Sequence, residues 1–294
     1  MGTRYSAVFY APDDIDASAI NAALFASADK VDRQMSTWKP DSDLSRLNAA
    51  PAREWFWVPE ELMTVLDAAL RVGVESGGAF DIGVGDLVDA WGFGPAGTTP
   101  DAVRASALKS RTQPPAFELL ELDRVQTRVR KRSPIALDLS GIAKGYGVDA
   151  LANCLDGFGI TRYLVGIDGE LRARGHKPDG RAWAVAIERP VRDVREAMGV
   201  MELADAAIAT SGNYRQLGHT MDPVDRQPVR NRLASVTVVM PDCMLADAWA
   251  TALLVLGETE GVALARKRGM TALFAVHAGN DFEQISIVDG ERRD

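Results

Sequence analysis

The sequence contains little cysteine for its length. Only two cysteines, Cys154 and Cys243, occur in 294 residues, with no CxxC pair and no Cys/His cluster. A fold held together by disulfides, or a structural zinc site, needs more cysteines at closer spacing. Both classes are therefore excluded, and we expect the two cysteines to be buried free thiols.

The sequence also lacks an excess of positive charge. It has 33 Lys and Arg against 41 Asp and Glu, a formal net charge of −8 at pH 7. This balance argues against nonspecific binding to nucleic acid or to an anionic membrane surface. A polyanionic ligand must instead be bound by a local feature, such as a metal ion, a helix N-terminus or a few placed cations.

Long apolar runs are absent as well. The sequence has no stretch of 18 apolar residues, and no basic segment followed by an apolar one near its start. This predicts neither a transmembrane helix nor a signal peptide in this chain. We expect a cytoplasmic protein, or a periplasmic one if the sequence is the trimmed form of an exported chain.

The order of the elements that are present predicts an α+β fold. Residues 3–10 have a strand composition, and 16–35, 59–78 and the apolar 244–257 show helical patterns. Short runs bounded by Gly, Pro or Asp predict many strands in the second half. The expected architecture is mainly antiparallel sheets with packed helices. We expect a single domain over 1–294, or two closely packed sub-domains, because no low-complexity linker divides the chain.

Residues 135–151, IALDLSGIAKGYGVDAL, predict an apolar strand, a turn of small residues and a helix. They match neither common phosphate loop: Lys144 follows Ala143 rather than the glycine of GxxxxGK[ST], and the glycines are not spaced as GxGxxG. Such a turn at a helix N-terminus still suits an anion or a metal-bridged phosphate, with Lys144 as a cation and Asp138 as an acceptor. The alternative is a tight strand-to-helix connection with a surface lysine.

Asp247 and Thr251 lie four residues apart in an otherwise apolar helix, so both side chains share one helical face. A carboxylate in such a helix is costly unless it is paired or binds a cation. Carboxylate and hydroxyl oxygens are donors that suit Mg²⁺. The alternative is that the helix begins at Asp247, which would then be its N-cap.

His219 is one of three histidines and precedes an Asp-Pro turn, which makes it a candidate general base. The nearby segment TSGNY (210–214) offers hydroxyls and a glycine turn of the type that contacts phosphate or ribose. Four aromatic side chains lie among turns, where they can stack on a flat heterocycle or simply anchor the loops: Trp38, Phe80, Trp91 and Phe93.

In this order and at this spacing, the motifs resemble one family, the ApbE-type FAD:protein FMN transferases. They span nearly the whole chain, and the ordered set is far more specific than any one motif. The motifs are MGTRY (1–5), MSTWKPDSDLSRLN (35–48), GGAFDIGVGDLVDAWGF (77–93), DLSGIAKGYGVD (138–149), SGNY followed by HTMDP (211–223) and ADAWAT (246–251).

The resemblance implies an ApbE-like, T-fold-like architecture and assigns roles to individual positions. It implies Mg²⁺ bound by the Gly141 carbonyl and the side chains of Asp247 and Thr251, and His219 as a base. It implies FAD bound near Met1, Trp38, Ala79, Phe80, Asp81, Asp138, Lys144 and Met221.

Two segments depart from the family pattern. Residues 224–227 read Val-Asp-Arg-Gln where a Thr-Gly turn is usual, and residues 167–170 read Ile-Asp-Gly-Glu where the family has Gly-Gly-Asp. Loss of the glycine is expected to reshape the loop beside His219. These departures bear on substrate choice more than on the fold.

The resemblance implies a reaction in which FMN moves from FAD to a Thr or Ser hydroxyl of a target flavoprotein, with release of AMP. Asp247 would take part through the metal, and the acceptor is expected to belong to a membrane redox complex. Two alternatives stay open: hydrolysis of FAD by water, which makes an FAD pyrophosphatase, and flavin binding or delivery without chemistry.

Overall fold

The computed structural model describes residues 3–12, 14–97, 99–214, 218–279 and 281–293. It confirms the predicted α+β class, with antiparallel sheets and packed helices. The helices are α1 (Ala17–Met35), α2 (Asp43–Ala49), α3 (Glu60–Glu75), the 3₁₀ helix η1 (Ile82–Val84), α4 (Gly85–Ala90), α5 (Ala102–Lys109), α6 (Ala116–Leu119), α7 (Ala143–Gly157) and α8 (Cys243–Lys267). The strands are β1 (Tyr5–Phe9), β2 (Trp55–Trp57), β3 (Leu120–Asp123), β4 (Arg128–Lys131), β5 (Tyr163–Ile167), β6 (Glu170–Arg174), β7 (Trp183–Glu188), β8 (Ala197–Leu203), β9 (Ala206–Gly212), β10 (Met221–Asp222), β11 (Gln227–Pro228), β12 (Leu233–Met240), β13 (Thr271–Ala278), β14 (Asp281–Val288) and β15 (Glu291–Arg293).

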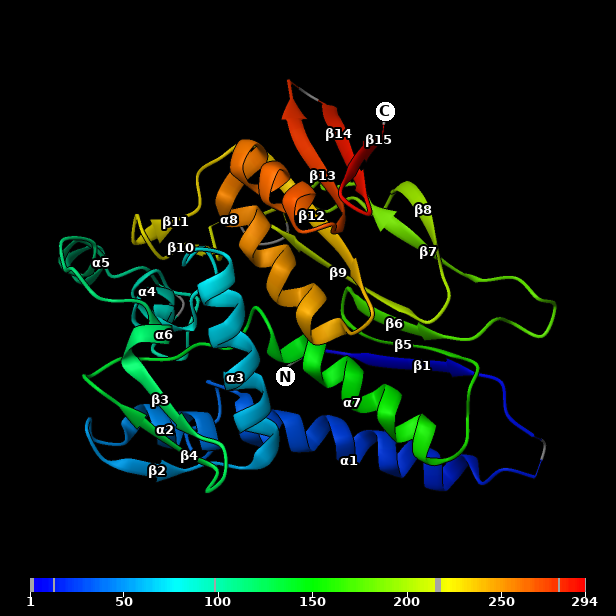
Figure 1. The fold of residues 1–294 in the computed structure, drawn as a ribbon, viewed down its shortest axis with the longest axis horizontal. Helices are drawn as coiled ribbons and strands as arrows, with labels where there is room; N and C mark the ends of the chain where they lie inside the picture. The colour runs from blue at the N-terminus through cyan, green and yellow to red at the C-terminus, as the bar shows by residue number, and fades with distance from the viewer. Residues whose placement is uncertain (1–2, 13, 98, 215–217, 280, 294) are drawn as a thin grey trace.

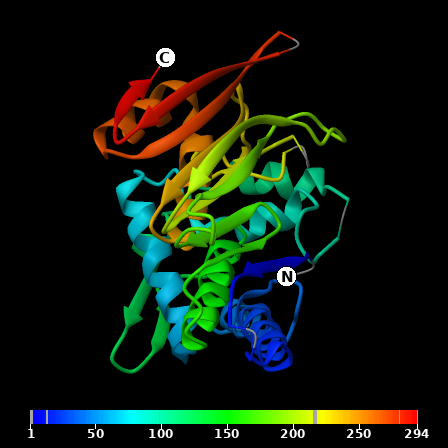
Figure 2. The same ribbon diagram turned by 90° about the vertical axis from the view of Figure 1, so that its right-hand side faces the viewer.

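The main sheet has eight strands in the order β1-β5-β6-β9-β12-β13-β14-β15, and neighbouring strands are antiparallel (Figure 1). Side chains alternate between its two faces, as the pleat of a strand requires. On one face α7 and α8 pack against the central strands, and α1 lies against α7. On the other face the β7–β8 hairpin packs on β6 and β9. Figure 2 shows the N-terminal helices at the bottom and the C-terminal strands at the top.

A smaller sheet, β2-β4-β3, lies on the far side of α3 from the main sheet (Figure 1). Its inward side chains, among them Val129, join the same buried cluster as Leu66 of α3 and Leu253 of α8. One apolar core therefore runs from the small sheet through α3 to α8. This core fixes the segments around residues 79–93 and 135–142 against the main sheet.

Helix α8 begins five residues earlier than the alternative N-cap interpretation placed it. Asp242 is the N-cap, and its carboxylate accepts a hydrogen bond from the Leu245 N–H at 2.9 Å. The helical path breaks at Gly257, as the sequence predicts, because this residue has a φ of 78°. The Asn231 side chain donates to the Leu254 carbonyl at 2.7 Å, so the break does not leave that carbonyl without a partner.

Among the described residues, α8 is the one helix long and apolar enough to span a membrane. Trp249 and Leu253 of this helix are buried in the core just described. The apolar length of α8 therefore reflects its place at the centre of the fold.

Two local predictions from the sequence are wrong. The segment 135–139 is buried but is not a strand, because its backbone is satisfied elsewhere: Leu137 N–H donates to the Asn48 side chain and Asp138 N–H to the Ile82 carbonyl, both at 2.8 Å. After the short helix α6, the strands β3 and β4 form a hairpin. The burial predicted for both cysteines is the second: both are free, as expected, but only Cys243 is buried, and Cys154 is half-buried.

Replacement of Leu253 by Ala should lower the free energy of unfolding by about 3 kcal/mol, because the side chain is fully buried and leaves a cavity. Urea unfolding followed by circular dichroism measures this. Val103→Ala is the control: Val103 is 82% exposed, and its replacement should change stability by less than about 0.5 kcal/mol. Equal effects of the two substitutions would contradict the assignment of α8 to the core.

Candidate active site

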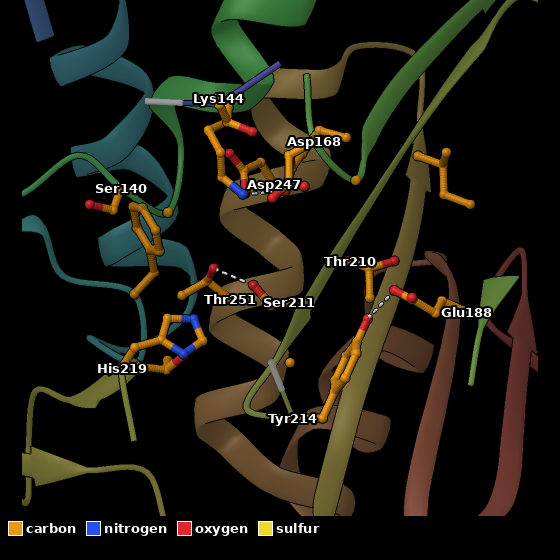
Figure 3. A pocket seen from close by; sticks show the side chains of 18 of the residues that line it. Ser140, Lys144, Asp168, Glu188, Thr210, Ser211, Tyr214, His219, Asp247 and Thr251 are labelled. Carbon is orange, nitrogen blue, oxygen red and sulfur yellow. Dashed lines mark hydrogen bonds and ion pairs between the residues drawn. The ribbon is translucent and has the colours of Figure 1, made fainter. Parts of the chain in front are cut away.

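A cavity of about 730 Å³ opens where the start of α7, the second turn of α8 and the strand β9 meet (Figure 3). Most of the site residues predicted from the sequence line it, although they come from four separate stretches of the chain. These are Ala79, Phe80, Asp81, Asp138, Gly141, Lys144, His219, Met221, Asp247 and Thr251. This volume is typical of sites for small molecules and cofactors.

Two nominated residues are not placed at the cavity. Met1 lies outside the described residues. Trp38 is not among the described residues that line the cavity; it lies in a turn just after α1 and is 60% exposed. The roles of both residues in FAD binding stay predictions.

Asp247 is held at the cavity by a contact between two helices. Its Oδ2 accepts a hydrogen bond from the Gly145 N–H at 2.9 Å, although the two residues are 102 positions apart. A Cβ on Gly145 would clash with the Cys243 carbonyl and would lie 2.8 Å from the Asp247 Cβ. Glycine at 145 therefore lets the first turn of α7 touch α8.

Thr251 lies one helical turn after Asp247 and faces the same cavity. Its Oγ1 lies 2.7 Å from the Ser211 Oγ of β9, in a hydrogen bond that either hydroxyl can donate (Figure 3). A Cβ on Gly141 would lie 3.2 Å from both Thr251 Oγ1 and Phe80. The Gly141 backbone is thus close to Thr251, as a shared metal site would require.

Lys144 and Glu170 form an ion pair beside Asp247. Lys144 Nζ donates to Glu170 Oε1 at 2.6 Å, and Glu170 is 2% exposed. Burial alone would lower the pKa of Lys144, but the carboxylates of Glu170 and Asp247 raise it above its usual value. Lys144 therefore stays cationic, and it lines the cavity.

Glu170 is a site residue that the sequence interpretation did not nominate. Its second oxygen, Oε2, is buried and has no hydrogen-bond partner among the described residues. Its position was within reach of the sequence: Asp168-Gly169 is a signal for a two-residue hairpin turn, and the β5–β6 hairpin places Glu170 opposite Ile167. The same turn brings Asp168, with a φ of 56°, to the cavity.

Asp138 and His219 lie on the side of the cavity nearest η1 and α4. Asp138 is nearly buried, which raises its pKa, and its carboxylate accepts from the Ser140 N–H at 2.8 Å. His219 meets Phe93 edge to face, with ring centroids 6.5 Å apart. Figure 3 shows His219 across Thr251 and Ser211 from Thr210, Glu188 and Tyr214.

Burial, reinforced by the charge of Glu170, raises the pKa of Asp247 to about 7. An aspartate in the unfolded chain ionises near pH 4. Between about pH 4 and about pH 7, Asp247 is therefore protonated in the folded, metal-free protein and ionised in the unfolded chain. The free energy of unfolding falls as the pH rises through this range.

Asp247→Asn cannot ionise, so the stability of this variant relative to the parent should grow over that window and level off above pH 7. The expected gain is on the order of a few kcal/mol. Urea unfolding of both proteins in a chelator, from pH 4 to pH 8, measures the difference. A difference that is constant with pH would contradict the assignment.

The comparisons agree with the motifs. The model of the ApbE family matches residues 1–274. The FAD:protein FMN transferase of Vibrio cholerae is 37% identical over 97% of this chain and 88% of that protein; the protein of the same name from Klebsiella pneumoniae is 36% identical over 96% and 84%. Among solved structures, the flavin transferase ApbE from Vibrio cholerae matches with a TM-score of 0.88 at 37% identity, over 99% of this chain and 95% of that one. The Pseudomonas stutzeri flavinyl transferase ApbE matches with a TM-score of 0.88 at 35% identity, over 99% and 95%. The chain therefore belongs to the ApbE family.

Proposed function

We propose that this protein is a Mg²⁺-dependent FAD:protein FMN transferase. It moves FMN from FAD to a Thr or Ser hydroxyl of a target flavoprotein and releases AMP. The relatives named above are called FAD:protein FMN transferases, which supports the transfer of FMN from FAD to a protein. The observation that carries the proposal is the meeting of Lys144, Asp247 and Thr251 in the middle of one cavity large enough for a dinucleotide.

The shape of the cavity supports a ligand with two flat ends and a charged centre. Around η1 and α4 its wall is apolar and aromatic, with Phe80 and Phe93, and around β7 and β9 it is lined by Ile187 and Ile208. Lys144 and Asp247 lie between these two ends; in Figure 3 they are between His219 on one side and Glu188 on the other. FAD has the same arrangement, with its pyrophosphate between two ring systems.

The residues present fit a magnesium ion. Asp247 offers its Oδ1, since Oδ2 already accepts from Gly145, and Thr251 and Gly141 add a hydroxyl and a carbonyl oxygen. Oxygen donors of this kind suit Mg²⁺. No group of three or more His, Cys, Asp or Glu side chains in the described part of the chain could hold a metal alone, which fits a site completed by phosphate oxygens. When bound, the ion would neutralise charge on the pyrophosphate.

Lys144 supplies a second positive charge at the same place. It is anchored by Glu170, so it is already positioned before the ligand arrives. As the pyrophosphate bond breaks, negative charge grows on the departing AMP phosphate, and a fixed cation stabilises that charge. An acidic protein needs such a local cation to accept a polyanion.

We assign His219 the role of base toward the acceptor, because it lines the cavity. In this step the acceptor hydroxyl gives its proton to the imidazole, its oxygen bonds to the FMN phosphorus, and the bond from that phosphorus to the AMP oxygen breaks. FMN is then attached through a phosphoester. We place the acceptor in a membrane redox complex, as the resemblance implies. Water in place of the acceptor hydroxyl would give FAD hydrolysis to FMN and AMP.

Incubation of the protein with FAD, Mg²⁺ and a flavoprotein fragment that carries a candidate Thr/Ser motif should yield covalent FMN on the fragment and one AMP per FMN. Intact mass spectrometry and chromatography of the nucleotides measure both products. Free FMN with AMP would show the hydrolase instead, and unchanged FAD would contradict both enzymatic functions.

Asp247→Asn should reduce Mg²⁺-dependent turnover by at least about 100-fold, because a metal ligand is lost. The matched control is Asp242→Asn in the same helix. Asn caps a helix as well as Asp does, so this variant should keep its activity within about twofold. Comparable loss in both variants would show that the effect is structural and would remove Asp247 from the metal site.

A further inference from the structure

Residues 223–226 form the loop of a small hairpin beside the cavity. The strands β10 and β11 pair Met221 with Pro228 and Asp222 with Gln227. Asp222 shapes the first half of the loop, since its Oδ1 accepts from the N–H groups of Val224 and Asp225 at 2.8 and 2.9 Å. This is the segment where the sequence departs from the usual Thr-Gly turn.

Arg226 ends the loop in an unusual backbone conformation. Its φ is 52°, in the left-handed region that glycine adopts most easily. A non-glycine residue persists in this region when its surroundings hold it there. In Arg226 the side chain stabilises this conformation, because it is buried against the protein and only 8% exposed.

The Arg226 side chain links the hairpin to α5. Its Nε donates to the Leu108 carbonyl at 2.8 Å. Leu108 is in the last turn of α5, and its carbonyl also accepts from the Arg111 N–H at 3.1 Å. A cation is favoured at this end of a helix. Met221 packs into the same apolar cluster as Leu108. The hairpin is therefore fixed to α5 by this apolar contact and by the hydrogen bond from Arg226, in addition to an exposed hydrogen bond from Lys109 to Gln227.

The charge of Arg226 also affects a carboxylate in the cavity wall, on the side around η1 and α4. Asp81 lines the cavity and is half-buried. Loss of solvent raises the pKa of its carboxyl, while the Arg226 guanidinium acts in the opposite direction and favours the charged carboxylate. In turn, burial and the nearby Arg111 lower the pKa of Arg226. Arg226 is not itself among the described residues that line the cavity. It therefore acts through its neighbours.

We propose that Arg226 is a positioning residue for the flavin nucleotide: by fixing the β10–β11 hairpin to α5, it sets the places of Thr220 and Met221 in the cavity wall. This inference rests on the proposed function, in that FAD is taken to occupy this cavity. Removal of the guanidinium should therefore weaken FAD binding. The chemical step should stay nearly unchanged, because the groups proposed for it, Lys144, Asp247 and His219, lie outside the β10–β11 hairpin.

Three variants separate positioning from folding. Arg226→Gly keeps the left-handed backbone at no cost and removes only the side chain. Arg226→Lys keeps a charge but loses the planar, directed donors. Lys109→Ala is the matched control, because it removes an exposed bond between α5 and the same hairpin, Lys109 Nζ to Gln227 Oε1 at 2.8 Å.

FAD binding, measured by flavin fluorescence with Mg²⁺ and no acceptor, should be about tenfold weaker in Arg226→Gly, intermediate in Arg226→Lys and within twofold of the parent in Lys109→Ala. The KM for FAD should rise in parallel, with kcat within twofold. An unchanged Kd in Arg226→Gly, or loss of its folded circular dichroism spectrum, would overturn the proposal.

Phe80→Ala distinguishes this failure from failure of the proposed function. Phe80 lines the cavity directly, so its replacement should weaken FAD binding whatever Arg226 does. If Phe80→Ala weakens binding and Arg226→Gly does not, the positioning role is wrong and the FAD site stands. If neither variant changes the Kd, FAD does not bind in this cavity.

Discussion

The site depends on one buried contact, the hydrogen bond from the Gly145 N–H to the Asp247 carboxylate. It joins the first turn of α7 to the second turn of α8, so that two segments about 100 residues apart form one wall of the cavity. The approach is close enough that residue 145 can carry no side chain. The two helices then present Lys144 and Thr251 to the same space. Neither segment alone therefore indicates the kind of site, because each contributes only half of it.

Electrostatics explains how an acidic chain can receive a doubly charged dinucleotide. The net charge of −8 is not neutralised globally. Instead, a single lysine is held against Glu170, and a carboxylate is buried so deeply that burial raises its pKa to about 7. A carboxylate this costly to ionise in the free protein gains much from a cation. The buried Asp247 carboxylate therefore lowers the stability of the free protein, as is expected of a residue that binds a cation.

The sequence predicted the family and the fold class, since both follow from patterns that are local in the chain: six ordered motifs, helical spacing at 16–35 and 59–78, and strand-like runs. It also nominated most of the cavity residues. It could not choose between Asp247 as an N-cap and as an interior residue, because Asp242 is an equally good cap and only the structure shows which one is used. Glu170 was missed because its function depends on a pairing with Lys144 across 26 positions. Arg226 was interpreted only as the loss of a glycine from the turn. The burial of its side chain depends on the position of α5, which no local sequence pattern predicts.

The central claim is that the start of α7 and the second turn of α8 bind one metal-bridged flavin nucleotide. The most direct measurement is a crystal structure of the protein with FAD and Mn²⁺, in which anomalous scattering locates the ion. We predict one strong anomalous peak within coordination distance of the Gly141 carbonyl, Asp247 and Thr251, with the pyrophosphate of FAD beside it and close to Lys144. Nucleotide bound with the ion elsewhere, or with Asp247 still contacting only Gly145, would contradict the account.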